Sequence, residues 1–250
     1  APQGRGLGFE VEMTSASLPI HSNPTKLIPM RKLTATLCLT LAVLLGSAGM
    51  SESTDFATTL REYHPFAEKW GDGDAQFILG AIYEEGIVVP KDYENAVKWY
   101  RLAAEHGNAN AQSSLGSMYY GGKGVPKNYK TAVTWFKLAA EQGEASAQDN
   151  LGMMHAYGRG VPKKDYKTAM KWYRLAAKQE YAPAQFSLGT MYHHGQGVPQ
   201  NYKNAMKWFR LAAEHGYRYA SYNLALMYLK GQGVPQNDKT ALKWFRPLPV

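Results

Sequence analysis

The feature that most constrains this chain is a repeat of about 36 residues that begins near residue 75 and runs to the C-terminus. Two residue types mark it independently. Leucines recur at intervals of 36, 36, 37 and 36, and tryptophans at intervals of 36, 37, 36 and 36: Leu79, Leu115, Leu151, Leu188 and Leu224, and Trp99, Trp135, Trp172, Trp208 and Trp244. A period of this length indicates stacked units, because one small unit cannot bury its own apolar face. We divide 75–250 into repeats 75–110, 111–146, 147–183, 184–219 and 220–250, with the extra residue in the Pro-containing segment 161–165.

Each repeat contains two stretches with helical periodicity, separated by a glycine and a Val-Pro pair. In the first repeat, Ala75, Ile78, Leu79 and Ile82 share one face of a helix predicted over about 74–85. A glycine then stands where a left-handed residue ends a helix: Gly86, Gly122, Gly158, Gly195 and Gly231. The next helix is preceded by a residue that suits an N-cap: Asp92, Asn128, Asp165 and Asn201.

The second helix of each repeat carries an aromatic pair and an alanine pair on one side. In the first repeat these are Trp99 with Tyr100 and Ala103 with Ala104. Small alanines let neighbouring helices approach closely, and the aromatic pair is expected to fill the space between layers. The sequence therefore predicts an all-α solenoid of helix-turn-helix repeats. Residues 56–74 follow the second-helix pattern imperfectly, and we expect 49–74 to form a linker and an N-terminal capping half-repeat.

The segment before the repeats predicts an export signal. Basic residues at 31–32 precede an apolar run at 33–45, and small residues at 46–48 suit a cleavage site, as in a secretory signal peptide. We predict a signal peptide over 30–48, an upstream or non-native segment over 1–29, and a periplasmic or secreted mature protein without a transmembrane anchor. The alternative is that 33–45 forms a buried helix or an uncleaved anchor. Cleavage would remove Cys38, the single cysteine, and with it any thiol chemistry.

The fourth repeat shows the most recognisable pattern. It reads Ala-Gln-Phe-Ser-Leu-Gly-Thr-Met-Tyr over 184–192, Gly-Gln-Gly-Val over 195–198, then Tyr202, Ala205, Trp208-Phe209 and Ala212-Ala213. This pattern resembles the Sel-like repeat family, a relative of the tetratricopeptide repeat, over about 75–246. The resemblance implies a right-handed α/α superhelix that acts as an adaptor or scaffold. Some secreted members with a disulfide in each repeat bind or slowly hydrolyse β-lactams. This chain lacks those cysteines, so a β-lactam- or cell-wall-directed hydrolase is only an alternative.

One side of each first helix is not required by the predicted core, yet it carries apolar and aromatic side chains. In related solenoids the first helices line the concave wall, so this side predicts a groove for a protein or peptide partner or a cell-wall glycan. The alternative is that these side chains pack against the adjacent first helix. The predicted ligand-binding residues are Phe77, Tyr120, Met153, Phe186, His193, Tyr222 and Leu226, beside Ser113, Ser117, Asp149, Thr190 and Leu229.

The net charge of +8 favours an acidic partner without identifying one. Basic residues recur beside the tryptophans and predict a stripe that either meets solvent or contacts an anionic polymer, lipid headgroups or an acidic protein: Lys98/Arg101, Lys171/Arg174, Lys207/Arg210 and Lys243/Arg246. The export signal argues against nucleic acid.

The sequence predicts no metal, cofactor or catalytic residue. His193-His194 has no third ligand at a suitable spacing, and no strand precedes the Gly-x-Gly turns. Nucleophile motifs are absent. A non-catalytic binding scaffold is therefore the favoured function, and a secreted factor that binds a host protein is an alternative form of it.

Overall fold

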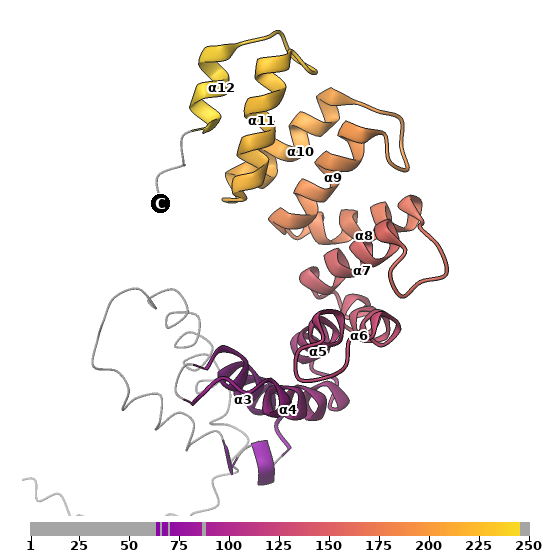
Figure 1. Ribbon diagram of the computed structural model, residues 1–250, viewed down its shortest axis with the longest axis vertical. Helices are drawn as coiled ribbons and strands as arrows, with labels where there is room; N and C mark the ends of the chain where they lie inside the picture. The colour runs from indigo at the N-terminus through magenta and orange to yellow at the C-terminus, as the bar shows by residue number, and fades with distance from the viewer. Residues whose placement is uncertain (1–63, 66, 70, 87–88, 246–250) are drawn as a thin grey trace, which may run out of the picture. The chain divides into compact units, whose positions relative to one another are not determined.

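The computed structural model describes residues 64–65, 67–69, 71–86 and 89–245 (Figure 1). The chain divides into two compact units, 1–51 and 52–250, and the described residues belong to the second. The predicted upstream segment 1–29, the predicted signal peptide 30–48 and most of the predicted capping segment 49–74 lie outside the described residues. Those three predictions therefore stay untested.

Ten helices follow one another over 73–245, and that range, apart from 87–88, contains no strand. The first helices of the repeats are α3 (Gly73–Glu85), α5 (Ala109–Gly121), α7 (Ala145–Tyr157), α9 (Ala182–His194) and α11 (Arg218–Lys230). The second helices are α4 (Tyr93–Glu105), α6 (Tyr129–Glu141), α8 (Tyr166–Lys178), α10 (Tyr202–Glu214) and α12 (Asp238–Phe245). Helices that are adjacent in sequence pack against each other, and the pairs follow one another in chain order (Figure 1). The predicted all-α repeat fold is confirmed.

Local sequence chemistry sets the helix ends as predicted. Gly86 adopts φ +68° after α3, and its N–H donates to the Ile82 carbonyl at 2.9 Å. The other four predicted glycines end their helices in the same left-handed conformation, which an L side chain adopts only at a cost. Asp92 caps α4 by accepting from the Asn95 N–H at 3.0 Å. The predicted caps Asn128, Asp165 and Asn201 make equivalent bonds at α6, α8 and α10.

The two helices of a repeat meet where an aromatic ring lies on a glycine. A Cβ added at Gly116 of α5 would come within 2.7 Å of the Phe136 ring of α6, closer than real Cβ atoms approach other atoms. Glycine is therefore required here by space and not by backbone conformation. The contact recurs in four repeats, and each ring is buried: Gly80–Tyr100, Gly116–Phe136, Gly152–Tyr173 and Gly189–Phe209.

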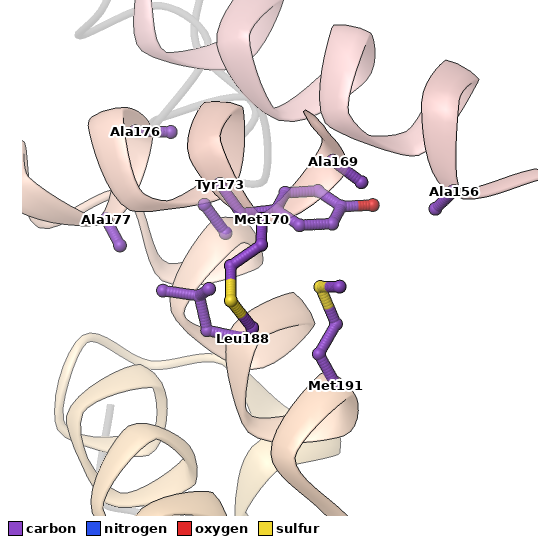
Figure 2. Packing of buried hydrophobic residues seen from close by; sticks show 9 residues of the cluster. Ala156, Ala169, Met170, Tyr173, Ala176, Ala177, Leu188 and Met191 are labelled. Atoms are coloured by element: carbon purple, nitrogen blue, oxygen red, sulfur yellow. The ribbon is translucent and has the colours of Figure 1, made fainter. Parts of the chain in front are cut away.

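The same rings belong to hydrophobic clusters that lie between repeats. Each cluster joins the second helix of one repeat to the first helix of the next. Figure 2 shows the cluster around Tyr173, in which Met170 of α8 meets Leu188 and Met191 of α9. Burial of one such large side chain contributes about 1.5–3 kcal/mol. The core of this protein thus forms between repeats, as the stacking argument predicts.

The tryptophans do not fill the layers as expected. In the first four repeats only the second ring of the aromatic pair is buried, whereas Trp99, Trp135, Trp172 and Trp208 are half-buried. Trp172, for example, packs against the edge of the cluster formed by α6 and α7, which belongs to the preceding repeat interface. The reason is that the space next to each glycine holds only one ring. The residue that follows the tryptophan occupies this space.

The fifth repeat departs from this arrangement. Ala225 stands at the glycine position, and Phe245 of α12 is 42% exposed where the corresponding rings of the other repeats are buried. Phe245 lies instead against the Tyr222 ring, with 5.8 Å between ring centroids. At the equivalent glycines of the other repeats an added Cβ would overlap the ring of the second helix. The ring-on-glycine contact of the first four repeats is therefore incompatible with an alanine at this position.

We predict that Gly116→Ala lowers the free energy of unfolding by about 1–3 kcal/mol, because the new methyl group would overlap the Phe136 ring. Gly121→Ala in the same helix is the matched control. A Cβ there meets only the Lys123 side chain at 3.6 Å, so alanine should be neutral or stabilising by roughly 0.5–1 kcal/mol. Urea unfolding of the three proteins measures the difference. Equal stability of the two variants would contradict the role given to the ring contact.

Candidate functional site

Buried glutamines in the first helices join consecutive repeats. Gln112 Nε2 donates to the Ala104 carbonyl of the preceding repeat at 3.1 Å, and its Oε1 accepts from Gln142 Nε2 at 2.8 Å. The glutamines at this position are all buried: Gln76, Gln112, Gln148 and Gln185. Sequence reasoning missed them, although an Ala-Gln pair recurs at the same place in four repeats. A polar residue at a fixed position beside the core was the signal that could have found them.

Three residues of the predicted groove contribute to packing. The Phe77 ring centroid lies 5.8 Å from that of Tyr100, and Met153 packs against the cluster of α6 and α7. Phe186 lies 5.4 Å from Phe209 and 5.0 Å from Tyr217. The premise that the core leaves this side of the first helices unused is wrong for all three. The two phenylalanines pack against clusters formed by the second helix and the adjacent first helix, so the packing alternative holds for both.

Tyr120 and His193, two further predicted groove residues, join repeats through the turn that follows the next first helix. The Arg159 guanidinium donates to the Tyr120 hydroxyl oxygen, and His193 Nε2 lies 3.2 Å from Gln232 Oε1. Glu84 occupies the same position in the first repeat and forms an ion pair with Lys123 at 3.8 Å. These side chains are half-buried, so the structure gives each of them a structural contact that the sequence did not predict.

The remaining predicted groove residues lie on α11. Leu226 is half-buried, whereas Tyr222 is 53% exposed and Tyr219, one turn earlier, is 67% exposed. Tyr219 also lies 5.7 Å from Tyr217, which in turn contacts Phe186. These rings run from the packed interior of the fourth repeat to the exposed side of the fifth. We call the set Phe186, Tyr217, Tyr219 and Tyr222 the aromatic surface.

The predicted basic stripe on the second helices is exposed over its described members and also connects repeats, whereas Arg246 lies outside the described residues. Arg101 donates to the Tyr119 hydroxyl of the next repeat at 3.1 Å, and Arg210 donates to that of Tyr228 at 3.3 Å. Arg174 makes the equivalent bond to Tyr192 at 3.4 Å. These arginines therefore have a structural partner, whatever else they contact.

Asp149 lies in the predicted row, at the position that Phe186 occupies in the next repeat. Its Oδ1 atom is buried and has no hydrogen-bond partner among the described residues. Burial raises the pKa of this carboxyl group to about 7, and a hydrogen bond from Ser187 opposes that effect more weakly. Burial raises the pKa of Tyr181 to about 12, and the nearby charge of Asp149 adds to that effect. Asp149 therefore changes its charge near neutral pH.

The described residues offer no group of three or more His, Cys, Asp or Glu side chains that could hold a metal ion. The His193 and His194 rings contact each other edge to face, at 4.7 Å between centroids. Within the same described ranges, no helix is long and apolar enough to cross a membrane.

Five consecutive segments match the Sel1 repeat: residues 73–108, 109–144, 145–181, 182–217 and 218–247. The chain belongs to the Sel1 repeat family. Each matched segment begins two residues before the repeat boundary predicted from the sequence. Its first residue is also the first residue of a first helix. The resemblance on which the predicted fold rested is confirmed.

Solved structures of Sel1 repeat proteins share this fold. A Sel1 repeat protein from Oxalobacter formigenes is 38% identical, with a TM-score of 0.66 over 70% of this chain and 69% of that one. A protective antigen of uropathogenic Escherichia coli with an SLR fold is 35% identical, with a TM-score of 0.69. That match covers 90% of this chain and 48% of the antigen, so this chain spans about half of the antigen's length.

The immunity protein Pa5087 from Pseudomonas aeruginosa is 22% identical, with a TM-score of 0.52 over 74% of this chain and 72% of that one. At this identity the likeness shows the fold alone. A comparison with curated proteins finds no match.

We predict that Asp149→Asn stabilises the protein increasingly as the pH rises. The folded-state pKa of about 7 lies above the ordinary value of 3.8, so the wild type loses stability between about pH 4 and pH 7, where this carboxyl group is ionised in the unfolded chain but still protonated in the folded one. The asparagine variant does not ionise. Its free energy of unfolding should exceed that of the wild type by more than about 1 kcal/mol at pH 8.

Asp165→Asn is the control, because its carboxylate caps α8 and hydrogen bonds from Thr168 lower its pKa. That stabilisation is present above its ordinary pKa and is lost only as the pH falls further. The difference between wild type and Asp165→Asn should thus stay constant from about pH 5 to pH 8. Urea titrations across this range test both statements. An Asp149→Asn effect that is equally flat would contradict the raised pKa.

Proposed function

We propose that this protein is an exported, non-catalytic scaffold that binds a protein or peptide partner through its aromatic surface. Sel1 repeats generally mediate protein–protein interaction. One observation supports this location of the binding surface. Tyr219 and Tyr222 are 67% and 53% exposed, while Phe186 and Tyr217 beside them are held by ring contacts.

The aromatic surface has the properties of an interaction hot spot. Tyrosine is enriched in such places because it buries a large area and loses little conformational entropy. Phe186 is held between Phe209 and Tyr217, so the buried end of the surface is already ordered before a partner arrives. Pre-ordered contacts reduce the entropy lost on binding. A cell-wall glycan could stack on the same rings and is an outcome that the experiment below distinguishes.

The periodic residues support a scaffold rather than an enzyme. Glutamines, arginines and tyrosines recur because each set forms hydrogen bonds between consecutive repeats, as at Gln112, Arg101 and Tyr119. Stacking explains why a residue that makes such a contact recurs in several repeats. Turnover of the β-lactam nitrocefin by the purified protein would contradict the non-catalytic part of the proposal.

We predict that Tyr219→Ser combined with Tyr222→Ser lowers retention of the partner at least about tenfold, with the helical circular dichroism unchanged. The measurement is a pull-down from the native cell envelope with the full chain, followed by identification of the retained species. Phe186→Ser combined with Tyr222→Ser should have the same effect on binding, with some loss of stability because Phe186 is half-buried.

Leu138→Ser is the matched control, since Leu138 is a 41% exposed apolar side chain on α6, outside the aromatic surface. It should retain the partner as the wild type does. Retention by the double tyrosine variant at the wild-type level would reject the aromatic surface. Retained material that is destroyed by glycosidases and not by proteases would assign the surface to a glycan.

The export part of the proposal rests on the sequence of residues 30–48 and has its own test. Expression of the full chain in a bacterium should yield a protein in the envelope fraction or the medium whose N-terminus lies close to residue 49. Mass spectrometry of the intact protein identifies that terminus. Replacement of Leu41 and Leu44 by Arg should interrupt the apolar run and keep the protein uncleaved. Normal processing of that variant would contradict the predicted signal.

A further inference from the structure

The turn after α7 holds a cation among three aromatic rings. The Arg159 guanidinium carbon lies 5.6 Å from the Tyr120 ring centroid, 5.8 Å from that of Tyr129 and 5.4 Å from that of Tyr157. The three tyrosines belong to α5, α6 and α7, so two consecutive repeats build the arrangement. Cation–π contacts and the hydrogen bond to Tyr120 hold the guanidinium in place. Arg159 and Tyr157 are nevertheless exposed.

Comparison with the other repeats shows that this cation is not neutralised. At the same position Lys123 pairs with the Glu84 carboxylate at 3.8 Å, and the fourth and fifth repeats carry the uncharged Gln196 and Gln232. No carboxylate of the described residues lies within 4.0 Å of Arg159. The position is thus periodic, but an unpaired charge occurs there in the third repeat alone.

Other basic residues belong to the same region. The turn 158–165 contains the one extra residue of the third repeat, and it carries Lys163 and Lys164, whose backbone atoms lie beside Gly158. Lys127 lies over the Tyr129 ring at 5.8 Å. The turn's single acidic residue, Asp165, already accepts hydrogen bonds from the first N–H groups of α8. We name Arg159, Lys127, Lys163, Lys164 and the three tyrosines the turn cluster.

We propose that the turn cluster binds an acidic segment of a protein partner. In this complex the Arg159 guanidinium donates hydrogen bonds to a carboxylate of the partner. A guanidinium presents several donors in a planar fork that matches a carboxylate, and only Tyr120 among the described residues accepts from it. Charge alone would attract any polyanion. The exposed Tyr157 ring adds apolar area beside the charge, and arginine with tyrosine is the combination enriched at protein–protein hot spots.

The inference rests on the proposed function as a protein-binding scaffold, but it uses a different surface. The turn cluster belongs to the second and third repeats, whereas the aromatic surface belongs to the fourth and fifth. Variants in one surface leave the other intact. An experiment that contradicts binding at the turn cluster is therefore distinguishable from one that contradicts binding at the aromatic surface.

The test measures the fluorescence anisotropy of labelled decaglutamate with the full chain, at about 50 mM salt, where screening is weak. We expect Arg159→Gln to weaken binding at least about fivefold. Arg210→Gln is the matched control, because Arg210 is also exposed, also donates to a tyrosine hydroxyl of the next repeat, and loses the same charge. It should weaken binding less than about twofold. Equal effects of the two variants would overturn the proposal.

Two further variants distinguish the planar donors of the guanidinium from its charge. They also keep the proposal testable if Arg159→Gln does not fold. Arg159→Lys keeps the charge and loses the planar donors, so it should still weaken binding more than about twofold. Tyr157→Ser removes an exposed ring and should weaken binding without lowering the melting temperature. Wild-type affinity of both variants would overturn the proposal even if Arg159→Gln fails to fold. Displacement of decaglutamate by polyphosphate of equal charge at about tenfold lower concentration would assign the site to phosphate polymers instead, contrary to the proposal.

Discussion

The structure depends on an aromatic ring that lies directly on a helical glycine. At Gly80, Gly116, Gly152 and Gly189 the absence of a side chain lets the second helix approach until a buried ring covers the backbone of the first. The opposite side of that ring belongs to the cluster shared with the next repeat. One contact therefore sets both the geometry within a helix pair and the stacking of successive pairs. Where Ala225 takes the place of glycine, the ring of Phe245 stays partly exposed.

Polar contacts repeat with the same period and complete the stacking. The buried Gln112 bridges to the carbonyl of Ala104, and Arg101 reaches across the outside of the repeat boundary to Tyr119. A buried amide that lost such partners would cost about 1–3 kcal/mol, which is a reason for the same residue type to recur at one position in several repeats. Residues that recur with the period of this chain are thus explained by contacts that stack the repeats.

The residues on which our proposals rest break the period, and so does Asp149. Asp149 places a carboxyl group of raised pKa where its neighbours along the row have a serine or an aromatic ring. Arg159 carries an unneutralised charge where other repeats have an ion pair or glutamine. The exposed tyrosines lie on α11, the helix in which Ala225 replaces the glycine of the ring-on-glycine contact. A solenoid offers many similar surfaces, and such departures let it treat a partner differently at each repeat.

The amino-acid sequence alone determined the repeat, the helices and their ends. Those features rest on local chemistry: apolar spacing within one helix, a left-handed glycine at Gly86 and a cap at Asp92 each act within a few residues. Only the tertiary structure decided which side chains stay free. Phe186 has the same apolar character as Tyr222, but it is covered by a ring 23 positions away and by Tyr217. Arg159 meets Tyr120 across 39 positions, a contact that depends on how two repeats stack and that no local pattern encodes.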